Sequence, residues 1–331
     1  MEPSESQQDR SEALNSGCVV GADIGGTNLR LALSDRNGTV MAKWSTSTAD
    51  TRNPDVVVGL VCEGVEAMLR RTSVPRSSLR AIAAGVPGVT DVDQGVVIAT
   101  SYLMGWRDVP LRKLLEAALG VPASIDNDVN IAAIGESWAG AAQGVRDFVF
   151  LAIGTGIGAG IVLNGQIFRG RGWTAGEIGY MLVPGTPEEP VERGKPGALE
   201  GIVGGEGIQS QWRSHWSEAN TLLTKSATAT QIFDHALEHN QLAHHLLEKA
   251  SRTLAYAIYN MSLILNCPLF VLGGGVGMHP ALCNATSNIL AQRSARVQPR
   301  LVRSALGSGA QLTGAIRLAL DTIVTDSANI D

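Results

Sequence analysis

The stretch from residue 18 to 33 constrains the fold most, because it joins two apolar segments through a glycine turn. It reads CVVGADIGGTNLRLAL, and the turn consists of Gly25, Gly26, Thr27 and Asn28. This order predicts a β-hairpin with a small polar tip. Paired glycines permit φ > 0 and leave no Cβ between the backbone amides and a ligand. Free N–H groups at such a tip form a concave anion site that suits phosphate.

Asp23 stands near the end of the first apolar segment, two residues before Gly25. A carboxylate beside a phosphate site needs a cation between the two negative groups. Mg²⁺ prefers one or two carboxylates together with water and phosphate oxygens. We therefore expect Asp23 to lie near a hydrated Mg²⁺ ion, with residues 25–28 around the terminal phosphates of a nucleotide. An ordinary glycine hairpin is the alternative interpretation of the same residues.

The composition predicts a large core and gives no sign of a nucleic-acid surface. The chain has 331 residues, of which 44% are apolar, and a net charge of −5, so it can form two domains and lacks a basic patch. The four cysteines form no C-x-x-C pair and are expected to be reduced and buried. Residues 1–17 are expected to be a disordered polar tail, without signal peptide or membrane anchor. We expect a soluble cytoplasmic protein that binds neither nucleic acid nor a membrane.

Residues 148–168 repeat the opening layout of strand, glycine tip and strand. The tip of this second hairpin contains Gly154, Thr155 and Gly156. Two copies of one phosphate-type hairpin predict a duplicated α/β architecture of two lobes, each with a mixed sheet flanked by helices. The glycine spacing matches neither G-x-G-x-x-G nor G-x-x-x-x-G-K-[ST], so a Rossmann fingerprint and a P-loop are both excluded.

A cluster of polar residues at 126–130, DNDVN, stands between a predicted strand and a predicted helix. Asn127 or Asp128 can cap that helix, which accounts for one of these side chains. Capping does not account for the whole cluster. A carboxylate at a strand end beside a helix N-terminus is well placed to act as a base toward a bound hydroxyl.

The remaining apolar patterns predict the elements around these motifs. Apolar residues spaced by three and four predict helices, and short apolar runs predict strands. The helices are expected at 56–71, 111–119, 202–212, 228–240, 242–265 and 308–323, and further strands at 40–44, 79–85, 95–100, 123–125 and 181–183. A glycine run at 273–277 follows a strand at 269–272, and such bare backbone lets a flat ring lie against it.

Together, these glycine segments, the acid cluster and their order resemble the sugar kinase and actin-like ATPase superfamily. More narrowly, the chain resembles the ROK family of glucokinases, other hexose and N-acetylhexosamine kinases, and sugar-responsive repressors, over about residues 18–324. The segments that carry this resemblance are GADIGGTNLR (21–30), AGVPGVTD (84–91), GW (105–106), DNDVNIAAIGE (126–136), GTGIGAGIV (154–162), AGEIG (175–179), GALE (197–200) and VLGGGV (271–276). The resemblance implies a two-lobed actin-like ATPase (ribonuclease H-like) fold, with residues 18–126 and 308–325 as the N-terminal lobe and 127–307 as the C-terminal lobe.

The resemblance also implies a role for each matching residue. Asp128 is expected to be the general base that takes the proton from a sugar hydroxyl, usually the 6-OH. Substrate contacts are expected from Gly88, Asn127, Asp128, Glu177, Tyr180 and Glu200. Nucleotide contacts are expected from Asp23 (through hydrated Mg²⁺), Gly25, Gly26, Thr27, Asn28, Gly154, Thr155, Gly156, and from Gly274 and Gly275 under the adenine. The implied function is ATP-dependent phosphorylation of a hexose, glucose at its 6-hydroxyl above all, by a homodimer.

Three features depart from the family pattern. Tyr180 stands where typical members have a histidine that serves both the sugar and a structural zinc, and Tyr102 stands where asparagine is common. The zinc cysteines are all missing from residues 191–200, so we expect no structural zinc and a loop held by packing. The identity of the sugar is therefore open, and mannose, fructose, N-acetylmannosamine and N-acetylglucosamine are the alternatives to glucose.

Two non-enzymatic functions are compatible with the same resemblance. The family's repressors carry a helix-turn-helix domain ahead of the first hairpin, and the 17 polar residues found there are too few for one, so a repressor is disfavoured. A sugar-binding protein that has lost catalysis would explain Tyr102 and Tyr180, but Asp23, Asp128 and the glycines are all retained.

Overall fold

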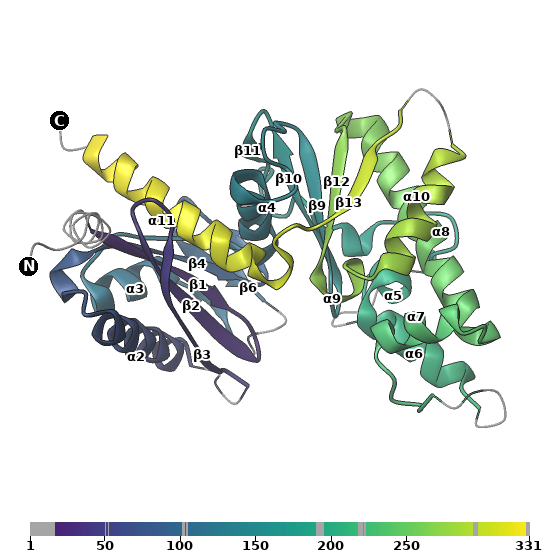
Figure 1. Cartoon of the computed structure of the whole chain (residues 1–331), viewed down its shortest axis with the longest axis horizontal. Helices are drawn as coiled ribbons and strands as arrows, with labels where there is room; N and C mark the ends of the chain where they lie inside the picture. Colours follow the sequence, from purple (N-terminus) through teal and green to yellow (C-terminus); the bar gives the residue numbers. More distant parts are fainter. Residues whose placement is uncertain are drawn as a thin grey trace, which may run out of the picture. The chain divides into compact units, whose positions relative to one another are not determined.

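The chain forms two compact units in the computed structural model (Figure 1). The structure describes residues 17–49, 51, 53–100, 103, 105–189, 195–217, 221, 223–293 and 297–328, with side chains up to 324. The first unit comprises the chain up to Trp138 and from Gly309 onward, and the second comprises Ala139–Ser308. No helix in the described ranges has the length and apolar character needed to cross a membrane.

The first unit is built on a five-stranded mixed sheet in the order β3-β2-β1-β4-β8. The first three strands are antiparallel neighbours, whereas β1, β4 and β8 run parallel. All seven residues of β1 are buried, as expected for a strand covered on both faces. The predicted hairpin is therefore confirmed, and the bounds are β1 Cys18–Ile24, β2 Asn28–Asp35, β3 Val40–Ser47, β4 Leu79–Val86 and β8 Ala123–Asn127.

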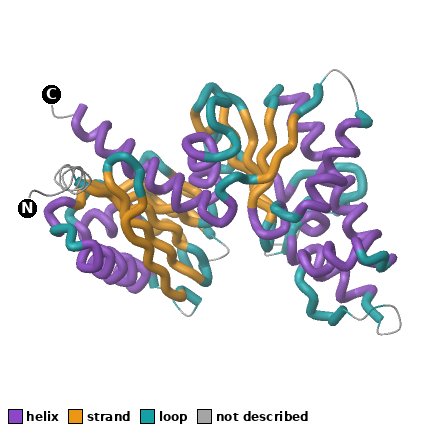
Figure 2. Tube along the Cα trace, in the orientation of Figure 1, coloured by secondary structure: helices purple, strands orange, loops and turns teal. Residues whose placement is uncertain are grey.

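Helices cover both faces of this sheet (Figures 1 and 2). Even-numbered residues of β1, such as Val20, share a core with α2 and α3, and odd-numbered residues, such as Val19, share one with α11. This alternation follows from the two-residue period of a strand. The 3₁₀ turn η1 (Arg76–Ser78) precedes β4, and the helices are α2 Pro54–Thr72, α3 Leu111–Leu119, α4 Asp128–Ala139 and α11 Ala310–Ala328.

Helix α4 belongs to the first unit because two glycines let it touch α11. A Cβ at Gly135 would lie 2.4 Å from the Ala310 carbonyl oxygen, and one at Gly314 would lie 1.8 Å from that of Ile131. The backbones of α4 and α11 are therefore in direct contact. Contacts between residues divide the chain into its two units after Trp138. The boundary expected from the sequence was residue 126, which lies twelve residues earlier.

A small sheet of order β5-β6-β7 completes the first unit. Its strands are β5 Val89–Asp91, β6 Val96–Ala99 and β7 Arg107–Val109. Of these three short strands, the sequence predicted β6 alone. The other two contain three residues each, too few for an apolar pattern to show.

The second unit repeats the pattern of the first sheet, in the order β11-β10-β9-β12-β13. The strands β9, β10 and β11 form an antiparallel meander, and β12 and β13 add to β9 in parallel. The α/β class with a mixed sheet flanked by helices in each unit is confirmed. The bounds are β9 Phe148–Ile153, β10 Ile157–Leu163, β11 Gln166–Ile167, β12 Leu269–Gly273 and β13 Arg300–Arg303.

The helices of this unit differ from the predictions at two points. The single helix expected at 202–212 is two helices, because Gly204 adopts an extended conformation with ψ 150°. The strand expected at 181–183 does not form, and the Thr186 hydroxyl instead bonds the Val183 backbone. The bounds are α5 Glu200–Val203, α6 Gly205–His215, α7 Ala229–Leu237, α8 Gln241–Leu265, α9 Gly274–Gly277 and α10 Pro280–Ala291, with 3₁₀ turns η2 Ile178–Tyr180 and η3 Gly307–Gly309.

Candidate functional site

The tip of the first hairpin is fixed by its own backbone and by Thr48. The Gly25 amide donates to the Asn28 carbonyl at 2.8 Å, and the buried Thr48 hydroxyl donates to the Gly25 carbonyl at 2.7 Å. Thr27 and Asn28 are exposed at the tip, where the side-chain Nδ2 of Asn28 donates to the Thr27 hydroxyl at 3.0 Å. The polar tip is thus presented outward from a rigid base.

Gly25 is required for a different reason than the sequence suggested. Its φ angle does not lie in the left-handed region, so the turn does not use the positive φ that glycine permits at this position. A Cβ there would approach the Asn28 carbonyl oxygen to 3.0 Å. The absence of a side chain therefore allows the tight closure of the turn.

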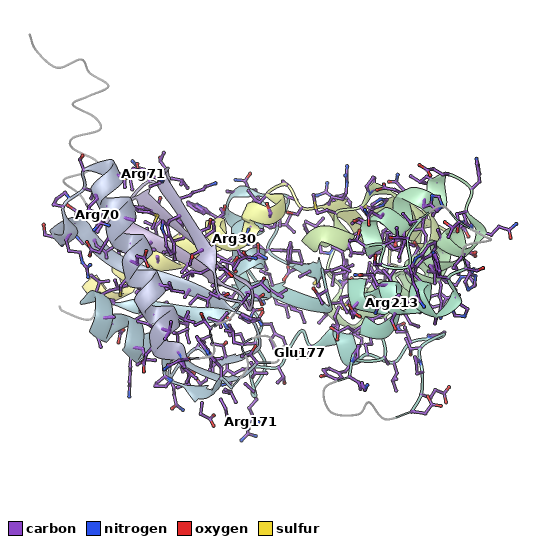
Figure 3. All side chains as sticks on the ribbon, turned by 90° about the horizontal axis from the view of Figure 1, so that it is seen from below. Arg30, Arg70, Arg71, Arg171, Glu177 and Arg213 are labelled. Carbon is purple, nitrogen blue, oxygen red and sulfur yellow. The ribbon has the colours of Figure 1, made fainter. Side chains whose placement is uncertain are left out.

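Asp23, the expected neighbour of Mg²⁺, is paired with Arg30 on the adjacent strand. The two residues are direct partners in the antiparallel β1–β2 register. Arg30 Nε and Nη2 donate to Asp23 Oδ2 at 2.8 and 2.5 Å, and Asp23 is 8% exposed (Arg30 is labelled in Figure 3). Burial raises the pKa of Asp23, and the Arg30 guanidinium opposes this shift. The other oxygen, Oδ1, accepts no hydrogen bond from any residue within the described ranges.

The sheet register brings Asp23 into one row with Gly85 and Asp126. Asp23 pairs with Gly85 on β4, and Gly85 pairs with Asp126 on β8. Side chains in one row point to the same face, and two strand spacings separate the acids by roughly 10 Å. Gly85 leaves the space between them without a side chain, and a Cβ there would lie 3.5 Å from the Asp128 Cα. The carboxyl ends of three parallel strands thus place Asp23 and Asp126 beside Asp128, the first residue of α4.

The polar cluster at 126–130 divides into structural and outward-facing members. Asp126 is 1% exposed and accepts hydrogen bonds from the Asn127 amide at 2.7 Å and Asn130 Nδ2 at 3.0 Å. Asn127 Oδ1 caps α4 by accepting from the Val129 amide at 2.8 Å. Asp128, which is half-buried, bonds the same amide through Oδ1 at 3.0 Å. Asn127 and Asp126 are therefore the structural members, and Asp128 retains an accessible surface.

Asn127 also ties the cluster to Gly88. Its Nδ2 donates to the Gly88 carbonyl at 2.9 Å, which brings two of the expected substrate residues together. Gly88 has φ +103°, and a Cβ would lie 2.3 Å from the Ala99 carbonyl oxygen. The loop after β4 can therefore take this path only with glycine at position 88.

In the second unit, the hairpin tip at 154–156 is clamped by the start of α6. The Gly205 amide donates to the Gly154 carbonyl at 2.8 Å, and the Glu206 amide donates to the Thr155 carbonyl at 3.0 Å. Thr155 itself is exposed. Because α6 begins directly after the break at Gly204, its first two backbone amides bond the carbonyl groups of the hairpin tip.

Glu200 and Glu177, two expected sugar contacts, lie close enough to influence each other. Glu200 Oε2 accepts from the Ile157 amide at 3.1 Å, just after the hairpin tip. The protein atoms packed around the Glu177 carboxyl raise its pKa, and the Glu200 carboxylate raises it further. Glu177 is labelled in Figure 3. Tyr180, the third expected contact in this region, is 61% exposed.

The glycine run after β12 lies against the same hairpin. Gly274 has φ +78°, and a Cβ would lie 2.4 Å from the Ile153 carbonyl oxygen at the end of β9. Gly275 is exposed, and a Cβ there would meet no atom within 4 Å. Bare backbone at Gly275 therefore faces open space beside the hairpin, as a flat ligand ring requires.

The expected site residues fall into one group in each unit. Asp23, Gly25–Asn28, Gly88, Asn127 and Asp128 belong to the first unit, and Gly154–Gly156, Glu177, Tyr180, Glu200, Gly274 and Gly275 belong to the second. Tyr102 and residues 191–194, within the segment that corresponds to the family's zinc loop, lie outside the described residues. Arg30 and Thr48 were not predicted as site residues from the sequence. The available signal for Arg30 was its position in the otherwise apolar run from residue 29 to 33, across the turn from Asp23.

These features define a class of protein: a hairpin with a glycine tip begins each of two mixed sheets, and acids gather at the strand ends beside it. This is the two-lobed fold of the actin-like ATPases, as in the ROK hexokinase from Thermus thermophilus, which is 30% identical with a TM-score of 0.74 over 93% of this chain and 99% of that one. The model of the ROK family matches residues 19–322, and the chain belongs to the ROK family.

Two curated relatives extend the comparison at the sequence level. A glucokinase from Halalkalibacterium halodurans is 32% identical over 269 residues, which cover 78% of this chain and 80% of that protein. An N-acetylmannosamine kinase from Salmonella typhimurium is 29% identical over 300 residues, 90% of this chain and 96% of that protein. These two relatives are thus kinases that act on different sugars.

Proposed function

We propose that this protein is an ATP-dependent hexose kinase that phosphorylates glucose at the 6-hydroxyl. Membership of the ROK family and the similarity to a glucokinase over most of both chains support this proposal. The observation that carries it is the position of Asp128, at the first turn of α4 and beside the row formed by Asp23, Gly85 and Asp126.

In this proposal, Asp128 accepts the proton of the sugar hydroxyl as that hydroxyl attacks the terminal phosphate. Phosphoryl transfer requires mainly alignment and charge neutralisation, and a positioned base adds about 10²–10⁴-fold. Asn127, held by its bonds to α4 and Gly88, would orient the sugar beside that base. In the second unit, Glu177 and Glu200 would accept hydrogen bonds from other sugar hydroxyls.

The residues present fit a magnesium nucleotide. Asp23 Oδ2 is occupied by Arg30 and Oδ1 has no partner in the described part of the chain, so one oxygen can accept a bond from metal-bound water. Mg²⁺ would supply charge neutralisation between the phosphates. The exposed tips at 25–28 and 154–156 would hold the phosphates, and the open face at Gly275 would take the adenine.

The second candidate is a kinase for another sugar, with N-acetylmannosamine first because of the relative from Salmonella typhimurium. Tyr180 leaves the identity of the sugar open, because an exposed phenol stands where typical family members use a histidine toward the sugar. Mannose, fructose and N-acetylglucosamine remain further options, as does a sugar-binding member without catalysis.

A substrate panel distinguishes these functions. ADP release would be followed through a coupled assay with ATP, Mg²⁺ and each of glucose, mannose, fructose, N-acetylglucosamine and N-acetylmannosamine. The proposal requires glucose to give the highest kcat/KM and Asp128→Asn to lower kcat by about 10²–10⁴-fold. A higher kcat/KM for N-acetylmannosamine would establish the second candidate. Sugar binding without ADP release from any sugar would identify a catalytically silent protein.

A further inference from the structure

We propose that a cavity in the second unit, next to α5 and α6, binds a small organic anion and transmits that binding to the hairpin tip at 154–156. The cavity has a volume of about 890 Å³, which suits a metabolite-sized ligand. Its lining consists of residues 185–187, Glu189 and residues 195–198, together with residues of α5 and α6 and Lys249 of α8. None of the expected sugar or nucleotide contacts is among its lining residues, so the cavity is separate from the candidate site.

Four charged residues line the cavity, namely Lys195, Lys249, Glu189 and Glu206, and among these four Lys249 is half-buried whereas the other three are exposed. The charge held closest to the protein interior is therefore positive, which favours an anion. Lys249 is half-buried and donates one hydrogen bond, at 2.9 Å, to Gln211 Oε1. Within the described ranges, no carboxylate forms an ion pair with Lys249 or Lys195. The Glu206 carboxylate in the lining is instead paired with Arg213 on its own helix, at 2.6 Å. The two ammonium groups therefore offer N–H donors to a phosphate or carboxylate.

The uncharged lining indicates a ligand with a carbon skeleton. Pro187, Pro196 and Ile202 provide apolar surface, and Ser210 adds a hydroxyl group. Inorganic phosphate alone would leave most of this apolar surface uncovered. The matching ligand is an organic molecule of about monosaccharide size that carries phosphate or carboxylate groups.

Hydrogen bonds connect this cavity to the hairpin tip through α5 and α6. Gln211 Nε2 donates to the Gly201 carbonyl at 3.0 Å, one residue after Glu200. Glu200 in turn accepts from the Ile157 amide, and the Glu206 amide holds the Thr155 carbonyl. The two short helices thus form the cavity wall on one side and the clamp of the tip on the other. In this proposal, an anion bound to the other N–H groups of Lys249 draws the ammonium group away from Gln211 and thereby alters this clamp.

The binding part of the proposal is tested by isothermal titration calorimetry on the whole chain without nucleotide. The probes are 3-phosphoglycerate and phosphoenolpyruvate, which carry phosphate, and citrate, which carries only carboxylates. We expect at least one probe to bind saturably, Lys249→Met to weaken it about tenfold, and Lys195→Met to weaken it less because this side chain is exposed. Lys225→Met is the matched control, since Lys225 is an exposed lysine of the same unit outside the lining.

Two results would overturn the binding site: no saturable binding of any probe, or equal affinity in Lys249→Met and the wild type. A difference between the phosphorylated probes and citrate identifies the preferred anionic group. Thermal melting of each variant shows whether the fold is retained, and the exposed Lys195 supplies a second test if Lys249→Met unfolds.

The coupling part rests on the proposed kinase function and has a separate readout. We expect the bound probe to change the KM for ATP by about twofold or more in the wild type and not in Lys249→Met. An unchanged KM at saturating probe would overturn the coupling. If no sugar is phosphorylated at all, the proposed function fails while the calorimetric result still decides the cavity.

Discussion

The guanidinium of Arg30 donates two hydrogen bonds to a single oxygen of Asp23, from the directly opposite position on the neighbouring strand. Asp23 is nearly fully buried, so its negative charge depends on this cation. The pairing leaves the second oxygen of Asp23 for another group. A structural ion pair and a role toward hydrated metal are therefore compatible in one side chain.

Replacement of Arg30 by methionine is expected to destabilise the fold by about 1–3 kcal/mol at neutral pH, because it leaves a buried carboxylate unpaired. Burial already raises the pKa of Asp23 above its unfolded value. A carboxyl with a raised folded pKa lowers stability above that pKa, and the loss disappears as pH falls and the group is protonated in both states. The difference in urea unfolding free energy between wild type and Arg30→Met should therefore shrink from pH 7 toward acid pH.

The double variant Asp23→Asn/Arg30→Met is the control for this prediction. It removes the charge that Arg30 compensates, so it should be more stable at pH 7 than Arg30→Met alone. A pH-independent deficit in Arg30→Met would show that lost packing, and not the unpaired charge, causes the effect.

Asp128→Asn is expected to lower kcat by about 10²–10⁴-fold, because asparagine cannot accept the proton of the sugar hydroxyl. The amide oxygen of the introduced side chain can still accept from the Val129 amide, so the start of α4 should be preserved. Sugar affinity, measured by equilibrium titration, should stay within a few-fold of wild type. Turnover close to wild type in this variant would exclude Asp128 as the base.

The raised pKa of Glu177 leads to the prediction that sugar binding depends on pH. Burial and the neighbouring Glu200 raise the pKa of Glu177, so its carboxylate is lost at a higher pH than that of an ordinary glutamate. The KM for the sugar should therefore increase as pH falls through this raised pKa. In Glu200→Gln, the repulsion is removed, and the acidic limb of the kcat/KM profile should move to lower pH. An acidic limb at the same pH in both proteins would contradict the coupling of the two carboxyl groups.

The two glycines after β12 offer a matched pair of substitutions. Gly274→Ala places a Cβ 2.4 Å from the Ile153 carbonyl oxygen at a φ of +78°, so it should destabilise the fold by about 1–3 kcal/mol. Gly275→Val adds a side chain where a Cβ meets no protein atom within 4 Å. It should leave the melting temperature nearly unchanged and raise the KM for ATP about tenfold. Equal ATP affinity in Gly275→Val would show that adenine does not lie on this glycine.

Local patterns in the chain determined the hairpins, most helices and the identity of the candidate residues. The apolar alternation on either side of Gly25 and Gly154 is a short-range signal, because neighbouring strands and their turn are continuous in sequence. The same applies to the cap of α4, where Asn127 bonds an amide two residues away. Such features depend on interactions within a few residues and are visible in the sequence alone.

Only the tertiary structure decided which distant residues meet. The row of Asp23, Gly85 and Asp126 depends on the register of three parallel strands, which no local pattern specifies. The placement of α4 in the first unit depends on the close approach of Gly135 and Gly314 to neighbouring backbone. The cavity beside α5 is lined by residues from 185 to 249, which only folding brings together. Backbone hydrogen bonds in turns and helices, and the period of apolar residues, involve residues that are close in sequence. Side-chain packing and strand register involve residues that are far apart in sequence. The sequence therefore identified the chemical groups, and the folded chain arranged them.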